Sequence, residues 1–171
     1  MTRRMDHIVA FTAPAEKIYQ DFTDRDYWES LMAHYRSMSQ ISDLTHFTKG
    51  PSGTDIVFRQ VFPRSELPPV ARAAMPVDMV ITREQHFDPF DPATSSAAGT
   101  YRAGIPAGLG HFRGRYLLSD NDSGSQLLLS SECKVKVPLM GGTLEQLILS
   151  NITQLFDDEG AFMSDWVAKH H

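Results

Sequence analysis

Residues 141–169 read GGTLEQLILSNITQLFDDEGAFMSDWVAK, the longest helical pattern in the chain. Its apolar residues recur at intervals of three and four, which places them on one face of a helix. They are Leu144, Leu147, Ile148, Ile152, Leu155, Phe156, Phe162, Met163, Trp166 and Val167. At about 1.5 Å per residue, a helix over 143–169 is roughly 40 Å long. A face of that length has to lie on a broad apolar surface formed by the rest of the chain.

Two polar residues, Asn151 and Glu159, interrupt this apolar face near its middle. If their side chains point inward, they mark polar points between the helix and the surface that it covers. If they lie at the edge of the face, they reflect ordinary helix packing. Both interpretations are open at the level of the sequence.

The composition predicts one soluble globular domain over residues 1–171, with 42% apolar and 22% charged residues. Sixteen basic against twenty-one acidic residues give a net charge of −5, which argues against nucleic acid as a partner. A single cysteine, Cys133, leaves no internal disulfide and fits a reducing compartment. No signal peptide and no apolar run of about 18 residues are present. We therefore expect a cytoplasmic protein without an integral membrane segment, of unknown oligomeric state.

The N-terminal part of the chain predicts one strand followed by two short helices. Residues 5–11 form the strand, and Pro14 suits the first turn of a helix, where its missing N–H costs nothing. Thr23-Asp24 can cap a second helix that carries apolar residues at helical spacing. Two short helices directly after one strand are an unusual opening.

From residue 37 the apolar period changes to two, which is typical of strands in an antiparallel sheet with one buried face. We expect six further strands, over 36–48, 56–62, 77–87, 99–103, 111–119 and 126–137. The proline-rich segment 63–76 interrupts them, with a single helical turn at 69–75, and is interpreted as a long connection or a lid. The last helix is the only element long enough to cover the sheet, so the element order predicts an α+β fold.

This order, which ends in Val135-Lys-Val-Pro-Leu-Met-Gly-Gly142 and the long helix, resembles the helix-grip (SRPBCC) superfamily. The superfamily includes the START lipid-transfer domains, the birch-pollen-allergen-like plant proteins and polyketide cyclases. Pro14-Ala-Glu-Lys-Ile-Tyr19 is similar to the usual first-helix opening. Asp24-x-x-Tyr-Trp28 and Lys134-x-Lys-Val-Pro-Leu-x-Gly-Gly142 resemble an uncharacterised, largely actinobacterial branch.

The resemblance implies a single START-like domain with a curved sheet of six to seven strands, which wraps around the last helix and encloses a hydrophobic cavity. Members of the superfamily bind sterols, lipids, polyketides or plant hormones, and a minority are enzymes. They share no catalytic motif, so the resemblance implies no catalytic residue. Fold alone does not establish function here.

The candidate ligand site lies between the sheet and the C-terminal helix. Strand alternation and the helical face predict its apolar lining: Phe58, Phe62, Met79, Ile81, Tyr101, Phe112, Tyr116, Leu129, Ile152, Phe156 and Met163. Arg83, Asn151 and Glu159 are the polar candidates that would orient a ligand. Arg83 shares a strand face with Met79 and Ile81 and suits a carboxylate or phosphate. The alternative is ordinary packing, with the apolar set as a filled core and Arg83 paired with an acid or extended into solvent.

Other chemistry finds no support in the sequence. His111, Arg113 and Arg115 alternate on what we interpret as an outer, solvated strand face. The histidines show no metal-ligand spacing, and Cys133 lies on the apolar side of a strand, where a thiol is usually inert. No catalytic residue, metal site or cofactor is predicted.

Three functions remain open. The leading hypothesis is a carrier or sensor of a small hydrophobic molecule, such as a lipid, a sterol or a polyketide-like compound. The first alternative is a polyketide cyclase- or hydrolase-like enzyme, which needs at least two polar side chains converging in the cavity. The second is a co-chaperone-like or structural interaction domain with a filled core, which a solid interior would favour.

Overall fold

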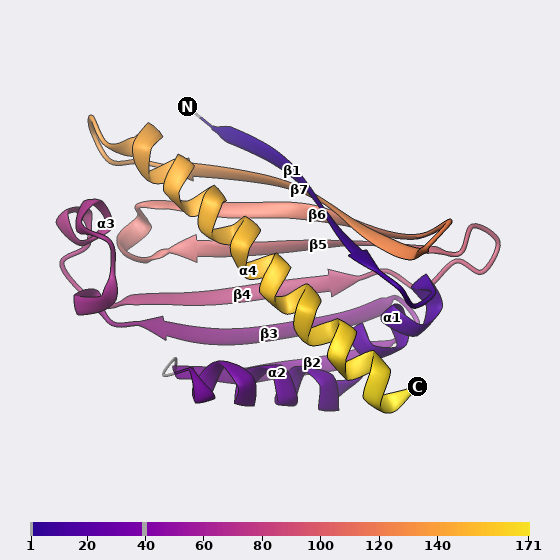
Figure 1. The fold of residues 1–171 in the computed structure, drawn as a ribbon. Helices are drawn as coiled ribbons and strands as arrows, with labels where there is room; N and C mark the ends of the chain where they lie inside the picture. Colours follow the sequence, from indigo (N-terminus) through magenta and orange to yellow (C-terminus); the bar gives the residue numbers. More distant parts are fainter. Residues whose placement is uncertain (1, 39–40) are drawn as a thin grey trace.

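The computed structural model describes residues 2–38 and 41–171, in which a seven-stranded antiparallel sheet carries one long helix across one face (Figure 1). The order of strands in the sheet is β1-β7-β6-β5-β4-β3-β2. The strands are β1 (Arg3–Phe11), β2 (Ile41–Gly50), β3 (Gly53–Phe62), β4 (Met79–Phe87), β5 (Ser96–Ile105), β6 (Gly110–Asn121) and β7 (Gly124–Val135). The helices are α1 (Ala15–Phe22), α2 (Arg25–Ser37), α3 (Pro69–Ala74) and α4 (Gly141–His170), with short 3₁₀ turns η1 (Arg64–Glu66) and η2 (Pro106–Gly108).

The predicted α+β architecture is confirmed, including the two short helices after β1. Asp24 caps α2 by accepting a hydrogen bond from the backbone N–H of Asp26 at 3.0 Å. The last helix extends over Gly141–His170, close to the predicted 143–169. It crosses the sheet diagonally, and α1 and α2 lie at its C-terminal end (Figure 1).

Several predicted strand boundaries are wrong: β3 begins at Gly53 instead of 56 and β4 at Met79 instead of 77, and further strands differ. β5 covers Ser96–Ile105 instead of 99–103, because ten consecutive pairs with β6 extend a strand whose Ala and Gly residues give little local signal. β2 begins at Ile41 instead of 36, because α2 continues to Ser37. β7 ends at Val135, two residues earlier than expected.

The segment 63–76 lies at the end of the sheet where α4 begins (Figure 1). Its predicted helical turn is present as α3, and Leu67 and Met75 are buried. Arg64 holds the segment together: its Nε donates to the carbonyl of Met75 at 2.6 Å and its Nη2 to that of Arg72 at 3.0 Å. A role of this segment as a lid stays a prediction.

Helix α4 packs closely against β1 at Gly160. A Cβ atom on Gly160 would lie 2.5 Å from Cγ1 of Val9, closer than real Cβ contacts come. Glycine costs about 1 kcal/mol relative to alanine inside a helix. Its presence at a buried position of α4 is therefore explained by the close contact with β1.

We predict that Gly160→Ala destabilises the protein by about 1–2 kcal/mol, because the overlap with Val9 outweighs the gain in helix propensity. Urea unfolding measures the effect. As a control, the same Gly160→Ala change is made in a protein that also carries Val9→Ala. That variant lacks the overlapping methyl group, so Gly160→Ala should there be neutral or stabilising. Equal effects in the two backgrounds would contradict this explanation.

His86 connects β3, β4 and the residues that follow β4. Its Nδ1 lies 2.7 Å from a carboxylate oxygen of Asp55, and its Nε2 lies 3.0 Å from one of Asp88. The hydrogen bond with Asp55, partly opposed by burial and aided by Asp88, raises the pKa of His86 above its usual 6.5.

This raised pKa predicts a pH-dependent contribution to stability. Because folding raises the pKa, the contribution is complete below the unfolded pKa of 6.5 and is lost as the pH rises through the folded value. The difference in unfolding free energy between the natural protein and His86→Gln should therefore shrink from pH 6 to pH 9. Urea unfolding across that range measures it, and a pH-independent difference would show that protonated His86 is not the stabilising form.

Candidate functional site

A buried ion pair links the sheet to α4. The side chain of Arg83 points from the middle of β4 toward α4, that of Glu159 points from α4 toward the sheet, and both are buried. Nη1 of Arg83 lies 3.1 Å from Oε2 of Glu159, and Nη2 lies 2.5 Å from Oε1. The hydroxyl of Tyr35 on α2 donates to the same Oε2 at 2.8 Å. Three elements that are distant in the sequence therefore meet at one carboxylate.

Aromatic rings surround the guanidinium of Arg83. Its Cζ lies 4.3 Å from the ring centroid of Phe58 and 5.3 Å from that of Phe156, at cation–π distance. Burial by itself lowers the pKa of Arg83, but the carboxylate of Glu159 more than offsets it, so the pKa lies above its usual value. Burial, followed by the Glu159 charge, raises the pKa of Tyr35 well above 10. At neutral pH the guanidinium is charged and the phenol is a hydrogen-bond donor.

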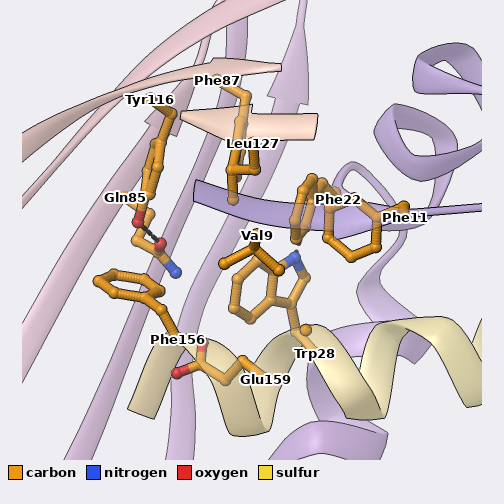
Figure 2. Close-up of a pocket in the computed structure, with 11 residues that line it drawn as sticks. Val9, Phe11, Phe22, Trp28, Gln85, Phe87, Tyr116, Leu127, Phe156 and Glu159 are labelled. Carbon is orange, nitrogen blue, oxygen red and sulfur yellow. Dashed lines mark hydrogen bonds between the residues drawn. The ribbon is translucent and has the colours of Figure 1, made fainter. Parts of the chain in front are cut away.

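A small cavity of about 20 Å³ lies beside the ion pair (Figure 2). Its walls come from β1, α1, α2, β4, β6, β7 and α4: Val9, Phe11, Phe22, Trp28, Gln85, Phe87, Tyr116, Leu127, Phe156, Glu159 and Gly160. One water molecule needs a cavity of roughly 10–15 Å³. In this conformation the space therefore accepts about one water and no larger molecule.

Gln85 brings an incompletely satisfied polar group to this cavity. Its Oε1 accepts a hydrogen bond from the hydroxyl of Tyr116, whose pKa burial raises well above 10. Its Nε2 is buried and has no hydrogen-bond partner within residues 2–38 and 41–171. If the amide were turned over, Oε1 would take its place as the unpaired end. Nε of Arg83, two residues earlier on the same strand face, is likewise buried and unpaired among the described residues.

The structure brings together part of the predicted site. Tyr116, Phe156 and Glu159 line the small cavity, and Arg83 and Phe58 lie next to it through the ion pair. The other predicted apolar residues pack in the core or at its border. Ile81, Tyr101, Phe112, Leu129, Ile152 and Met163 are buried, and Phe62 and Met79 are half-buried. The predicted set is therefore mostly core, with a few members at a void.

The structure excludes Asn151 from the predicted ligand site and decides the position that the sequence left open. Asn151 is exposed, whereas Glu159 is buried. Successive residues of a helix are rotated by about 100° around its axis. Glu159 comes seven residues after the buried Ile152 and therefore lies within about 20° of it around the axis. Asn151 is the residue before Ile152 and lies about 100° away from it, off the buried face. Asn151 therefore cannot orient a molecule in the interior.

Sequence analysis missed Gln85 and Tyr35. Gln85 could have been predicted from the sequence. It follows Arg83 by two positions, so strand alternation places both side chains on the same face of β4. Tyr35 carried no such signal. Its role depends on the packing of α2 against α4, which no local pattern reports.

The remaining reactive groups do not assemble into a site. In the described part of the chain, no group of three or more His, Cys, Asp or Glu residues could hold a metal ion. Burial, followed by the charge of Glu145, raises the pKa of Cys133 to about 12, so the thiol stays protonated. No helix within the described ranges is both long and apolar enough to cross a membrane.

Comparison with known proteins places this geometry in a family. Residues 6–167 match the family described as Protein of unknown function (DUF2505). The chain belongs to this family. The uncharacterized protein Rv0481c of Mycobacterium tuberculosis is 27% identical over 179 residues, covering 99% of each chain. The uncharacterized protein Mb0491c of Mycobacterium bovis matches to the same extent. These relatives agree with the predicted actinobacterial branch.

Solved structures confirm the fold. The chain is similar to norcoclaurine synthase from Thalictrum flavum, with a TM-score of 0.58, 17% identity and coverage of 100% of this chain and 89% of the other. It is also similar to Ara h 8.0201, with a TM-score of 0.57, 13% identity and coverage of 99% and 100%. The resemblance to the birch-pollen-allergen-like, helix-grip proteins is therefore borne out for the fold.

We predict that Arg83→Met and Glu159→Leu each destabilise the protein by about 3–5 kcal/mol, because each leaves an uncompensated charge in the interior. The double variant R83M/E159L should recover most of the loss, since apolar side chains of similar volume replace both charges. Urea unfolding of the four proteins gives the coupling energy. The exposed Arg102–Glu84 pair is the control, because removing either partner should cost below about 1 kcal/mol. Additive losses at residues 83 and 159 would contradict the coupling.

Proposed function

We propose that the protein binds a small, largely apolar molecule with one hydrogen-bond acceptor, in the interior between the sheet and α4. The observation that carries the proposal is the amide of Gln85. It is 4% exposed, lines the cavity and has an unpaired end among the described residues. A buried polar group without a partner costs about 1–3 kcal/mol. A ligand or water oxygen in the cavity would remove that cost.

The surroundings of Gln85 have the composition of a ligand site. Apolar and aromatic side chains supply most of the wall, and the polar groups of Gln85, Tyr116 and Glu159 converge on one side of it (Figure 2). The charge of Arg83 is held in place by Glu159 and the two flanking rings. Such a preorganised polar wall fixes the orientation of a bound molecule at little cost.

Other proteins of this fold give the proposal further support. The solved structure of norcoclaurine synthase is a complex with dopamine and hydroxybenzaldehyde. Both are small aromatic molecules with polar substituents, which is the chemistry that Gln85 and its apolar neighbours would accept. A protein of the same fold therefore accommodates molecules of this class.

Binding requires the interior to open, because about 20 Å³ holds only a water-sized guest. The segment 63–76 is the element best placed to open. It connects β3 to β4 at the end of the sheet where α4 begins, and the hydrogen bonds of Arg64 help to hold it in place. We therefore propose that it acts as the lid.

Native mass spectrometry and displacement of prodan, an uncharged fluorescent probe with one carbonyl acceptor, test this function. We expect bound mass above that of the chain and saturable probe binding. Gln85→Met keeps the length of the side chain but lacks the donor, and it should weaken probe binding by about tenfold. Gln20→Met, at an exposed position of α1, is the matched control and should leave affinity unchanged. Probe affinity that is equal in all three proteins would remove Gln85 from the site.

A second candidate function is an interaction domain with a filled core. The observation that favours it is the size of the cavity, since a solid interior is what such a domain needs. Native mass spectrometry and probe displacement also distinguish the two candidate functions. Absence of bound mass together with absence of saturable probe binding would replace the ligand-binding proposal with this one.

A further inference from the structure

The outer face of the sheet, opposite α4, carries side chains in well-defined cross-strand rows. Antiparallel pairing sets residues of neighbouring strands side by side at about 4.8 Å spacing. The charged row runs through Glu84, Arg102, Arg113, Glu132 and Arg4 on β4, β5, β6, β7 and β1. It lies in an open groove of about 940 Å³ on this face. Such a volume falls in the usual range for small-molecule sites.

Every charged group of this row has an oppositely charged partner within it. Arg102 pairs with Glu84, and Glu132 pairs with both Arg113 and Arg4. The hydrogen bond from Arg113 is the main cause that lowers the pKa of Glu132, so this carboxylate stays ionised. With three arginines and two glutamates, the row has a net charge of +1, and Glu132 is shared by two of its arginines.

The adjacent row is not compensated. It runs through Asp55, His86, Thr100, Arg115, Ser130 and Asp6. His86 is held by two aspartates, but Arg115 has no hydrogen bond or ion pair with any residue that the structure describes. Thr100 and Ser130 are exposed on the two sides of Arg115, so two hydroxyl groups flank one free guanidinium. Asp6 on β1 is paired with Ser130, and its negative charge repels an anion. An anion bound to Arg115 would therefore lie toward Thr100.

An apolar row borders Arg115 on the other side. Leu117 follows Arg115 on the same strand face, and it is paired with Ala98 on β5 and Leu128 on β7, which in turn pairs with Ile8 on β1. Leu117 is 43% exposed and Ile8 54% exposed. Large apolar side chains that are exposed side by side, next to an unpaired cation, mark a surface with two chemically distinct halves.

We propose that this face binds a small organic carboxylate with an apolar tail, held by Arg115, Thr100 and Ser130, with the tail along Leu117, Leu128 and Ile8. The planar guanidinium matches the two oxygens of a carboxylate. Arg115 is the one arginine of these two rows without an acidic partner among the described residues, and one guanidinium matches one negative charge, which favours a carboxylate over a phosphate dianion. This site lies on the opposite side of the sheet from Gln85 and is independent of the interior.

Backbone amide NMR titration with octanoate tests the proposal. We expect saturable shifts at Thr100, Arg115, Leu117 and Ser130. Acetate, which lacks the tail, and octanol, which lacks the charge, should each bind at least tenfold more weakly. Arg115→Gln should reduce octanoate affinity by about tenfold or more, since a charge-assisted contact is lost. Arg115→Lys, which keeps the charge but not the planar fork, should have an intermediate affinity.

Arg59→Gln is the matched control, because Arg59 is an exposed arginine on the outer face of β3 that does not line the groove. It should leave octanoate affinity unchanged. Equal losses in the two variants would reduce the effect to net charge and overturn the site. Acetate binding as tightly as octanoate would overturn the role of the apolar row, and tighter binding of octyl phosphate would overturn the choice of carboxylate. Shifts confined to residues around Gln85 would place octanoate in the interior and also overturn it.

Discussion

The packing of α4 on the sheet depends on the ion pair between Arg83 and Glu159. Removing either charge from water costs several kcal/mol, and only good geometry and further hydrogen bonds offset that cost. Here the offset comes from two contacts between guanidinium and carboxylate, the hydroxyl of Tyr35 and the rings of Phe58 and Phe156. Apolar contacts alone would tolerate a shift of the helix along the sheet. We infer that the ion pair selects one register, because any other would leave two buried charges apart.

In that register aromatic rings pack beside the ion pair. The rings of Phe22, Phe87, Tyr116 and Phe156 stack or meet edge to face and line a void that accepts about one water. The fold is shared with proteins that hold small molecules, but the fold does not determine how much of the interior is empty. The unpaired amide of Gln85 is a group that a fully satisfied core would not contain.

The two faces of the sheet use the same alternation for different purposes. Inward positions on β4 carry Arg83, Gln85 and Phe87, and the intervening positions carry Glu84 and His86 on the outside. One strand therefore contributes to the buried ion pair, to the cavity wall and to the outer charged rows. Because successive side chains point to opposite faces, these groups are separated by the thickness of the sheet and act independently.

The residues alone were enough to predict the element order, the antiparallel sheet, the long final helix and the strand face that Arg83 shares with Met79 and Ile81. Periodicity reports these features directly, because it follows from the geometry of each element. The sequence left three things open: the partner of Arg83, the outward position of Asn151 and the size of the cavity. Pairing Arg83 with Glu159 joins residues 76 positions apart, and the cavity depends on how rings from several elements fill one space. Only the tertiary structure could settle these, because they depend on distances between elements that no local pattern encodes.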